Sequence, residues 1–334
     1  MSLDDIRAQI SRSPVAVVGN INLDIKTSPL CATPALFAEG ETSVERIYES
    51  IGGGGANVAV AAAQLGGAAH FCGCIGADEL GARLQTTLEQ LGVVPHLRRK
   101  DTATGRSINL NWQDNRRHFI SSLPNARCLS ARDVDVARLA ECGCTHLYRA
   151  DVWFAAAMLA GGNDEVLRCA REHNMETSLD INWDPLWSDE ASSEQAARRK
   201  RQVRDVLLHV NWVHGNEREL CLFTARNDPR DACLSLLEAG AGGVIVHRGA
   251  SGAAALVADD WVEVAAAPVP AIICATGAGD VFSAAFMMLR DLPLAERLQM
   301  CGRVAAAHLQ GAPNLLPALG DDPDSQSTKI PEGS

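Results

Sequence analysis

The sequence of 334 residues lacks an excess of positive charge and lacks long apolar runs. Its 30 lysines and arginines stand against 41 aspartates and glutamates, for a formal net charge of −11. Nucleic-acid binding needs a basic surface, so this balance argues against a nucleic-acid partner. No apolar run reaches the roughly 18 residues of a membrane-spanning helix, and the acidic N-terminus is unlike a secretory leader. We therefore expect a globular cytoplasmic protein with no membrane partner.

The cysteines lack the spacing of a structural zinc site. There are 11 of them, an odd number in a chain too long to need disulfides for a core, which favours reduced thiols. Two pairs, Cys72/Cys74 and Cys142/Cys144, are spaced C-x-C, whereas zinc sites usually use C-x₂₋₄-C twice. Because alternation along a strand puts both thiols of C-x-C on one face, we favour buried strand cysteines over a metal site.

Two common nucleotide-binding patterns are also missing. No lysine follows a glycine in the frame G-x-x-x-x-G-K-[ST]. The glycine-rich turn at 52–55 leads into an expected helix over 58–65, but no acidic residue follows at the place that a dinucleotide site requires. Such a turn still lets a ligand approach the backbone closely.

The most informative segment is 275–280, with the sequence ATGAGD, which leads directly into the apolar run 281–289. Small residues before a helix allow consecutive backbone N–H groups to close on an anion at the positive end of the helix dipole. A carboxylate at Asp280 could then take a proton from an attacking hydroxyl beside a bound phosphoryl group. A plain helix N-cap is the alternative interpretation of Asp280.

Short apolar runs alternate with helical patterns along most of the chain. Strands are expected at 14–19, 68–75, 145–148, 177–181, 211–213 and 242–246. Helices are expected at 78–91, 131–141, 164–173, 192–209 and 228–239. This alternation predicts an α/β fold with a mainly parallel sheet. Segments 42–49, 106–112 and 117–120 have mixed faces and predict a small antiparallel flap over one edge.

Polar residues follow several of the expected strands. Asn22 and Asp24 come just after the strand at 14–19, where open α/β sheets place ligand contacts, although turn chemistry alone also explains them. Asn216 and Glu219 share a helix face, and their side-chain oxygens could bind a hard cation and its waters. The alternative is that both are ordinary polar residues on the protein surface. The glycine turn at 249–252 is another place where a nucleotide could lie against the backbone.

In this order, these segments resemble the ribokinase-like (PfkB) carbohydrate kinase family over about residues 14–317. The resemblance rests on 19–24, 52–57, 216–219, 249–252 and 276–280. It implies a three-layer α/β/α domain with a β-sheet lid, built from segments at about 25–50 and 104–121. Residues 1–13 would be an N-terminal extension, and the composition of 320–334 is typical of a disordered tail.

The resemblance also implies Mg-ATP and phosphoryl transfer to a hydroxymethyl group of a sugar or nucleoside. Asp280 would be the base, with the N–H groups of Gly277, Ala278 and Gly279 around the phosphoryl group. Asn22, Asp24, Gly53, Gly54 and Asn57 would bind the acceptor. Asn216, Gly249 and Gly252 would serve the nucleotide, and Asn216 and Glu219 would hold magnesium through water. A homodimer formed through the lid is a further expectation.

Three positions depart from the family pattern. Cys274 and Ala275 replace an Asp-Thr pair that contributes to a monovalent-cation site in relatives, so we expect little activation by K⁺. Gly54 stands where ribokinases often carry Lys, and Asp184 stands where relatives of fructokinase and keto-acid sugar kinase carry Arg. Asp184 would repel an anionic acceptor, and Gly54 supplies no positive charge to bind one. The sequence therefore predicts a neutral sugar as the acceptor.

Two other functions stay open at this point. One is a catalytically silent sugar-binding regulator on the same fold. The other is a nucleoside kinase, whose base slot could be built from Trp112, Phe119 and Trp153, unless these residues serve core packing.

Overall fold

The structure, a computed structural model, describes residues 3–11, 14–31, 33, 36, 38–114, 116–187, 194–273 and 276–319. Cys274, Ala275 and the segment 320–334 therefore lie outside the described residues, together with the expectations on potassium and on the tail.

Within the described residues, nine strands form a central sheet in the order β13-β12-β11-β10-β9-β8-β1-β4-β5. The strands are β1 (Val15–Val18), β4 (Ala69–Gly76), β5 (Val93–Lys100), β8 (His146–Arg149), β9 (Glu176–Asp180), β10 (Trp212–Asn216), β11 (Gly243–His247), β12 (Ala253–Val257) and β13 (Asp260–Val264). All neighbours pair in parallel except β11 with β12 and β12 with β13, which are antiparallel. β1, with the sequence VAVV, is fully buried, as a central strand covered on both faces must be.

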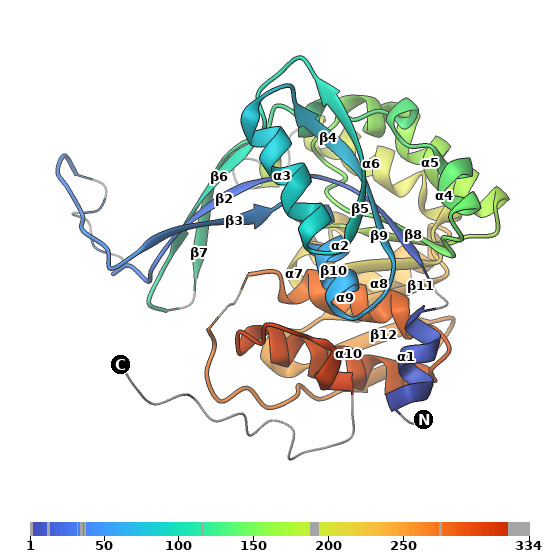
Figure 1. The fold of residues 1–334 in the computed structure, drawn as a ribbon. Helices are drawn as coiled ribbons and strands as arrows, with labels where there is room; N and C mark the ends of the chain where they lie inside the picture. The colour runs from blue at the N-terminus through green and yellow to red at the C-terminus, as the bar shows by residue number, and fades with distance from the viewer. Residues whose placement is uncertain are drawn as a thin grey trace.

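Helices cover both faces of this sheet and give the expected three layers (Figure 1). One layer contains α1 (Leu3–Ser11), α2 (Gly54–Gln64), α3 (Glu79–Gln90), α9 (Ala278–Met288) and α10 (Leu294–Leu309). The other contains α4 (Val136–Glu141), α5 (Asn163–Glu172), α6 (Glu194–Arg204), α7 (Glu217–Thr224) and α8 (Pro229–Glu238). No helix among the described residues is long and apolar enough to cross a bilayer.

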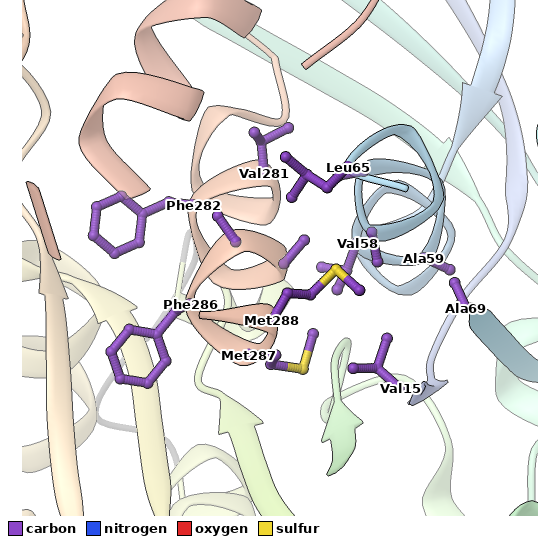
Figure 2. Packing of buried hydrophobic residues seen from close by; sticks show 14 of the residues in the cluster. Val15, Val58, Ala59, Leu65, Ala69, Val281, Phe282, Phe286, Met287 and Met288 are labelled. Carbon is purple, nitrogen blue, oxygen red and sulfur yellow. The ribbon is translucent and has the colours of Figure 1, made fainter. Parts of the chain in front are cut away.

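The core beneath α9 fixes the direction of that helix. Val281, Phe286 and Met288 are buried, and Figure 2 shows Val281 beside Leu65 and Met288 beside Val58, both from the region of α2, whereas Phe286 points to the other side of the helix. Burial of such side chains contributes about 1.5–3 kcal/mol each. The apolar run 281–289 therefore holds the start of α9 against the start of α2, where both glycine motifs lie.

A second sheet forms the lid, with strand order β3-β2-β6-β7. Its strands are β2 (Asn22–Thr27), β3 (Ile47–Gly52), β6 (Arg106–Asn111) and β7 (Arg117–Ser122), and they extend to one side of the main body in Figure 1. The expected lid sheet is thus confirmed, but two details were wrong. β2 pairs with β6 in parallel, so the lid is not purely antiparallel. Asn22 and Asp24 lie inside β2 rather than in a turn.

One face of the lid carries exposed isoleucine side chains. Ile47, Ile108 and Ile120 are 62%, 42% and 55% exposed. A homodimer through this face stays a prediction, which sedimentation velocity would test.

The cysteine interpretation is half correct. Cys72 and Cys74 are buried in strand β4, and burial raises the pKa of both thiols to about 12. Cys142, in contrast, caps the C-terminus of α4, and Cys144 lies in the following loop, so this pair is not in a strand. The described residues contain no group of three or more His, Cys, Asp or Glu side chains placed to hold a metal ion.

Candidate active site

The N-terminus of α9 has no side-chain cap. Gly277 is the N-cap residue, with φ +86° and ψ 4°, a left-handed conformation that favours glycine. It supplies no side-chain hydrogen bond to the first turn, so the leading N–H groups of α9 are left for a ligand. Asp280 lies three residues further on, which excludes the alternative that Asp280 is the N-cap.

The Asp280 carboxylate is fixed by the first turn of α2. Asn57 Nδ2 donates to Asp280 Oδ2 at 2.9 Å, across 223 residues of sequence. A side chain at Gly277 would approach the same two groups, since a Cβ there would lie 3.7 Å from Asp280 Oδ2 and 3.9 Å from Asn57 Nδ2. The structure therefore brings together Asn57, Gly277 and Asp280.

Negative charge gathers around Asp280. Burial is the main cause that raises the pKa of Asp280 well above its ordinary value, and the nearby Asp180, Asp151 and Glu219 raise it further. The Asn57 hydrogen bond acts in the opposite direction. A carboxyl group in such surroundings binds a proton tightly until a cation compensates its neighbours.

Sequence reasoning missed Asp151. This residue follows β8 with φ +57°, and its Oδ2 accepts hydrogen bonds from the N–H groups of Asn20 at 2.9 Å and Gly55 at 2.8 Å. A Cβ at Gly54 would lie only 2.8 Å from Asp151 Oδ1, so glycine is needed there to admit the carboxylate. The first turn of α2 thus already binds a carboxyl side chain.

Asp180 was also missed as a site residue. It ends β9 and accepts from Tyr148 Oη at 2.8 Å and from the Asn182 N–H at 3.1 Å. Burial, above all, raises the pKa of Asp180. A polar residue directly after an apolar strand was the available signal, because such residues collect at the carboxyl edge of a parallel sheet.

The lid contributes a second polar pair. Asn22 Nδ2 donates to Asp24 Oδ1 at 2.7 Å, and Lys26 Nζ lies 3.9 Å from Asp24 Oδ2. Asp24 is only 5% exposed, and burial raises its pKa against the opposing effects of Lys26 and Asn22. Gly53, with φ +97°, makes the turn between this sheet and α2, and a Cβ there would lie 2.4 Å from the Asn20 carbonyl oxygen.

Asn216 and Glu219 form a capping box at the start of α7. The Asn216 side chain accepts from the Glu219 N–H at 2.9 Å, and Glu219 Oε2 accepts from the Asn216 N–H at 2.9 Å. Burial first, and then Asp180, raises the pKa of Glu219. Each side chain keeps further oxygen lone pairs, so the cap and a role toward hydrated magnesium are compatible.

Replacing Asn216 by alanine should therefore reduce the free energy of unfolding by about 1 kcal/mol, the usual cost of losing an N-cap. Urea denaturation of wild type and variant measures this difference. Asn216→Ser, which restores a capping oxygen, should recover most of it, and equal stability of all three proteins would show that the cap contributes little.

Gly249 and Gly252 border a short turn between β11 and β12. Their φ angles are +55° and +91°, and a Cβ at Gly252 would lie 2.1 Å from the Val264 carbonyl oxygen. Glycine at 252 is therefore required by close backbone packing.

The strand before this turn ends at His247, and a Cβ at Gly279 would lie 3.2 Å from the Nδ1 atom of His247. Burial lowers the pKa of His247 to about 4, so this ring is neutral beside the α9 turn.

Asp184 does not present a free charge to a ligand. Its side chain is fully buried, and Arg199 binds it through Nε at 3.0 Å and Nη2 at 3.1 Å. The premise that an anionic acceptor would meet an uncompensated Asp184 is therefore wrong.

The three aromatic residues considered for a nucleoside-base slot do not lie together. Phe119 and Trp153 line one hollow with Asp184, whereas Trp112 lines another.

The comparisons with known proteins agree with this fold. The E. coli structure described as a Ribokinase II in complex with ATP and Mg²⁺ superposes with a TM-score of 0.75 at 24% identity, covering 92% of this chain and 97% of that one. Adenosine kinase from Sinorhizobium meliloti gives a TM-score of 0.75 at 21% identity, over 92% and 98% of the two chains. These similarities show a ribokinase-like fold.

The sequence comparisons identify the family. The model of the pfkB family carbohydrate kinases matches residues 13–313. Fructokinase from Salmonella typhimurium is 28% identical over 292 residues, which is 83% of this chain and 92% of that protein. The chain belongs to the pfkB family of carbohydrate kinases.

Proposed function

We propose that this protein transfers the γ-phosphoryl group of ATP to a hydroxymethyl group of a sugar. The observation that carries the proposal is the pairing of the uncapped start of α9 with Asp280, held by Asn57 at 2.9 Å. An anion site and a base thereby lie within one turn of helix. Phosphoryl transfer needs positioning and charge stabilisation more than covalent chemistry, which is what these groups supply.

In this proposal Asp280 takes the proton from the attacking hydroxyl. The backbone N–H groups at Gly277, Ala278 and Gly279 hold the transferring phosphoryl group, and the glycine turn with Gly249 and Gly252 contacts the nucleotide. On the acceptor side, Asn22 and Asp24 accept from sugar hydroxyls, and the turn at Gly53, Gly54 and Asn57 borders them. Asp24 is buried and already polarised by Asn22, so it is suited to bind hydroxyl donors.

Magnesium fits the charge balance of the site. Asp180, Asp151 and Glu219 all raise the pKa of Asp280, so the site carries more carboxylates than the described cations balance. Oxygen donors of this kind suit Mg²⁺, which keeps several of its waters. Asn216 and Glu219 would hold the ion through water. When bound, it would neutralise charge on the ATP phosphates.

ADP production with a panel of acceptors tests this function. The panel contains neutral sugars, acidic sugars, sugar phosphates and nucleosides, each at fixed Mg-ATP, with a no-acceptor control. We expect ADP formation that depends on a sugar. Fastest turnover with a nucleoside would favour the nucleoside kinase, and ligand-induced thermal stabilisation without any ADP formation would favour the silent binding protein.

A further inference from the structure

A hollow of about 920 Å³ beneath the lid carries a concentration of positive charge. Four arginines line it, namely Arg117 on β7, Arg127, Arg199 on α6 and Arg218 on α7, against the single carboxylate of Asp184. This is unexpected in a chain whose formal net charge is −11. Four positive charges and one negative charge leave the lining with a formal charge of +3, and a cavity with such walls favours an anion.

Arg199 is already engaged with Asp184. The two bonds from Arg199 to Asp184 form a fork-shaped pair, and Arg199 Nη2 also donates to the Trp153 carbonyl oxygen. Asp184 accepts a further bond from the Leu186 N–H at 3.0 Å. Both oxygens of Asp184 accept hydrogen bonds from Arg199, so this ion pair balances the charge of Asp184. The Asp184 carboxylate therefore does not repel an anion that binds in the hollow.

Arg218 and Arg127 are the groups available to a ligand. The Arg218 guanidinium carbon lies 4.5 Å from the centre of the Trp183 ring, a cation–π contact that stabilises the position of this side chain. A guanidinium in such a position can still bind an anion through two of its N–H groups. Both arginines are exposed, and neither forms an ion pair with a carboxylate in the part of the chain that the structure describes.

The hollow borders the proposed transfer site. Arg218 directly precedes Glu219, and both Glu219 and Asp180 affect the charge on Asp280. Ser121, on the lid wall of the hollow, lies 2.6 Å from Ser107, which is paired in register with Asp24. The hollow therefore adjoins the lid strand next to Asp24 and the first turn of α7, which carries Glu219, as an extension of the acceptor site would.

We propose that this hollow binds the anionic end of an acidic acceptor, a sugar that bears a carboxylate or a phosphate, through Arg218 and Arg127. The proposal rests on the proposed kinase function and names its substrate class. It replaces the neutral sugar that the bare sequence predicted, because the structure pairs Asp184 with Arg199.

The test uses acceptors that share one carbon skeleton and differ in charge at one end. Fructose, 2-ketogluconate and fructose 1-phosphate are such a set, with a free hydroxymethyl group at the other end, and matched aldose, aldonate and aldose 1-phosphate sets widen it. We expect higher kcat/KM for an acidic member than for its neutral partner. The carboxylate and phosphate arms show which anion is preferred. A neutral sugar as the best acceptor across the sets would overturn the proposal while leaving the kinase function intact.

Arginine variants assign the effect to the hollow. Arg218→Gln and Arg127→Gln should each raise KM for the acidic acceptor about tenfold, the scale of one hydrogen bond to a charged group, and leave KM for ATP unchanged. Arg138→Gln, at an exposed ion pair on α4, is the control and should change neither value. A raised KM for ATP alone, or an acceptor KM no different from the control, would contradict the assignment.

If no acceptor supports ADP formation, the kinase proposal fails, and binding still decides the substrate class. The same sets are then compared by their shift of Tm in wild type and in Arg218→Gln. Larger shifts for the acidic sugars, lost in the variant, support the hollow as an anion site. Equal shifts for neutral and acidic sugars overturn it.

Discussion

Asp280→Asn is expected to lower kcat by at least about 10²-fold and to leave KM for ATP nearly unchanged, the usual result of losing a general base. Asparagine keeps the shape of Asp280 but cannot accept a proton from the acceptor hydroxyl. Steady-state kinetics with the best acceptor measure the effect. Asp231→Asn, an exposed aspartate in the first turn of α8, is the matched control and should retain wild-type turnover. Near-normal turnover of Asp280→Asn would remove this residue from the mechanism.

The same substitution should stabilise the protein at neutral pH. Because the folded-state pKa of Asp280 is raised, the folded protein holds a proton that the unfolded chain releases. The free energy of unfolding therefore falls as pH rises from the ordinary aspartate range through the raised pKa. Asparagine does not titrate, so the variant avoids this loss of stability. In magnesium-free buffer, the variant should therefore have a higher Tm than the wild type at pH 7, and the difference in Tm should be smaller at pH 4. A lower Tm at pH 7 would show that the charge at Asp280 is compensated.

Asp24→Ala is expected to raise KM for the sugar at least about tenfold while KM for ATP stays constant. Hydrogen bonds to a charged group contribute roughly 1.5–3 kcal/mol, and the variant loses an acceptor that Asn22 holds in place at 2.7 Å. The proposed phosphate site at α9 should be unaffected because it belongs to another element.

Asp24→Asn separates charge from shape in this experiment. It keeps the volume and one acceptor oxygen, so its acceptor KM should lie between those of wild type and Asp24→Ala. Unchanged acceptor kinetics in both variants would place the sugar elsewhere.

The candidate site residues that the sequence could propose are those that depend on local chemistry. Gly277 and Asp280 could be proposed as site residues because small residues before an apolar helix are a local pattern. Of the nine strands described in the main sheet, six followed from their apolar runs, whereas β5, β12 and β13 were not predicted. The lid was predicted as well, since mixed faces do not suit a sheet covered on both sides.

Long-range pairings were beyond that reasoning. Asp151 binds the N–H groups of Asn20 and Gly55 across 131 and 96 residues, and no local pattern reports such contacts. The Arg199 partner of Asp184 lies on a helix 15 residues away, so Asp184 looked like a bare charge in the sequence. The parallel pairing of β2 with β6 also depends on tertiary packing, because turn signals indicate hairpins only between consecutive strands.

The most direct test of the central claim is to follow the γ-phosphorus of ATP by ³¹P NMR during turnover with the best acceptor. We expect the γ resonance to decline while a phosphate-monoester signal appears, coupled to the two protons of a CH₂ group on the sugar. Asp280→Asn should slow both changes together. Release of inorganic phosphate without a monoester, or a monoester formed equally fast by Asp280→Asn, would contradict the account.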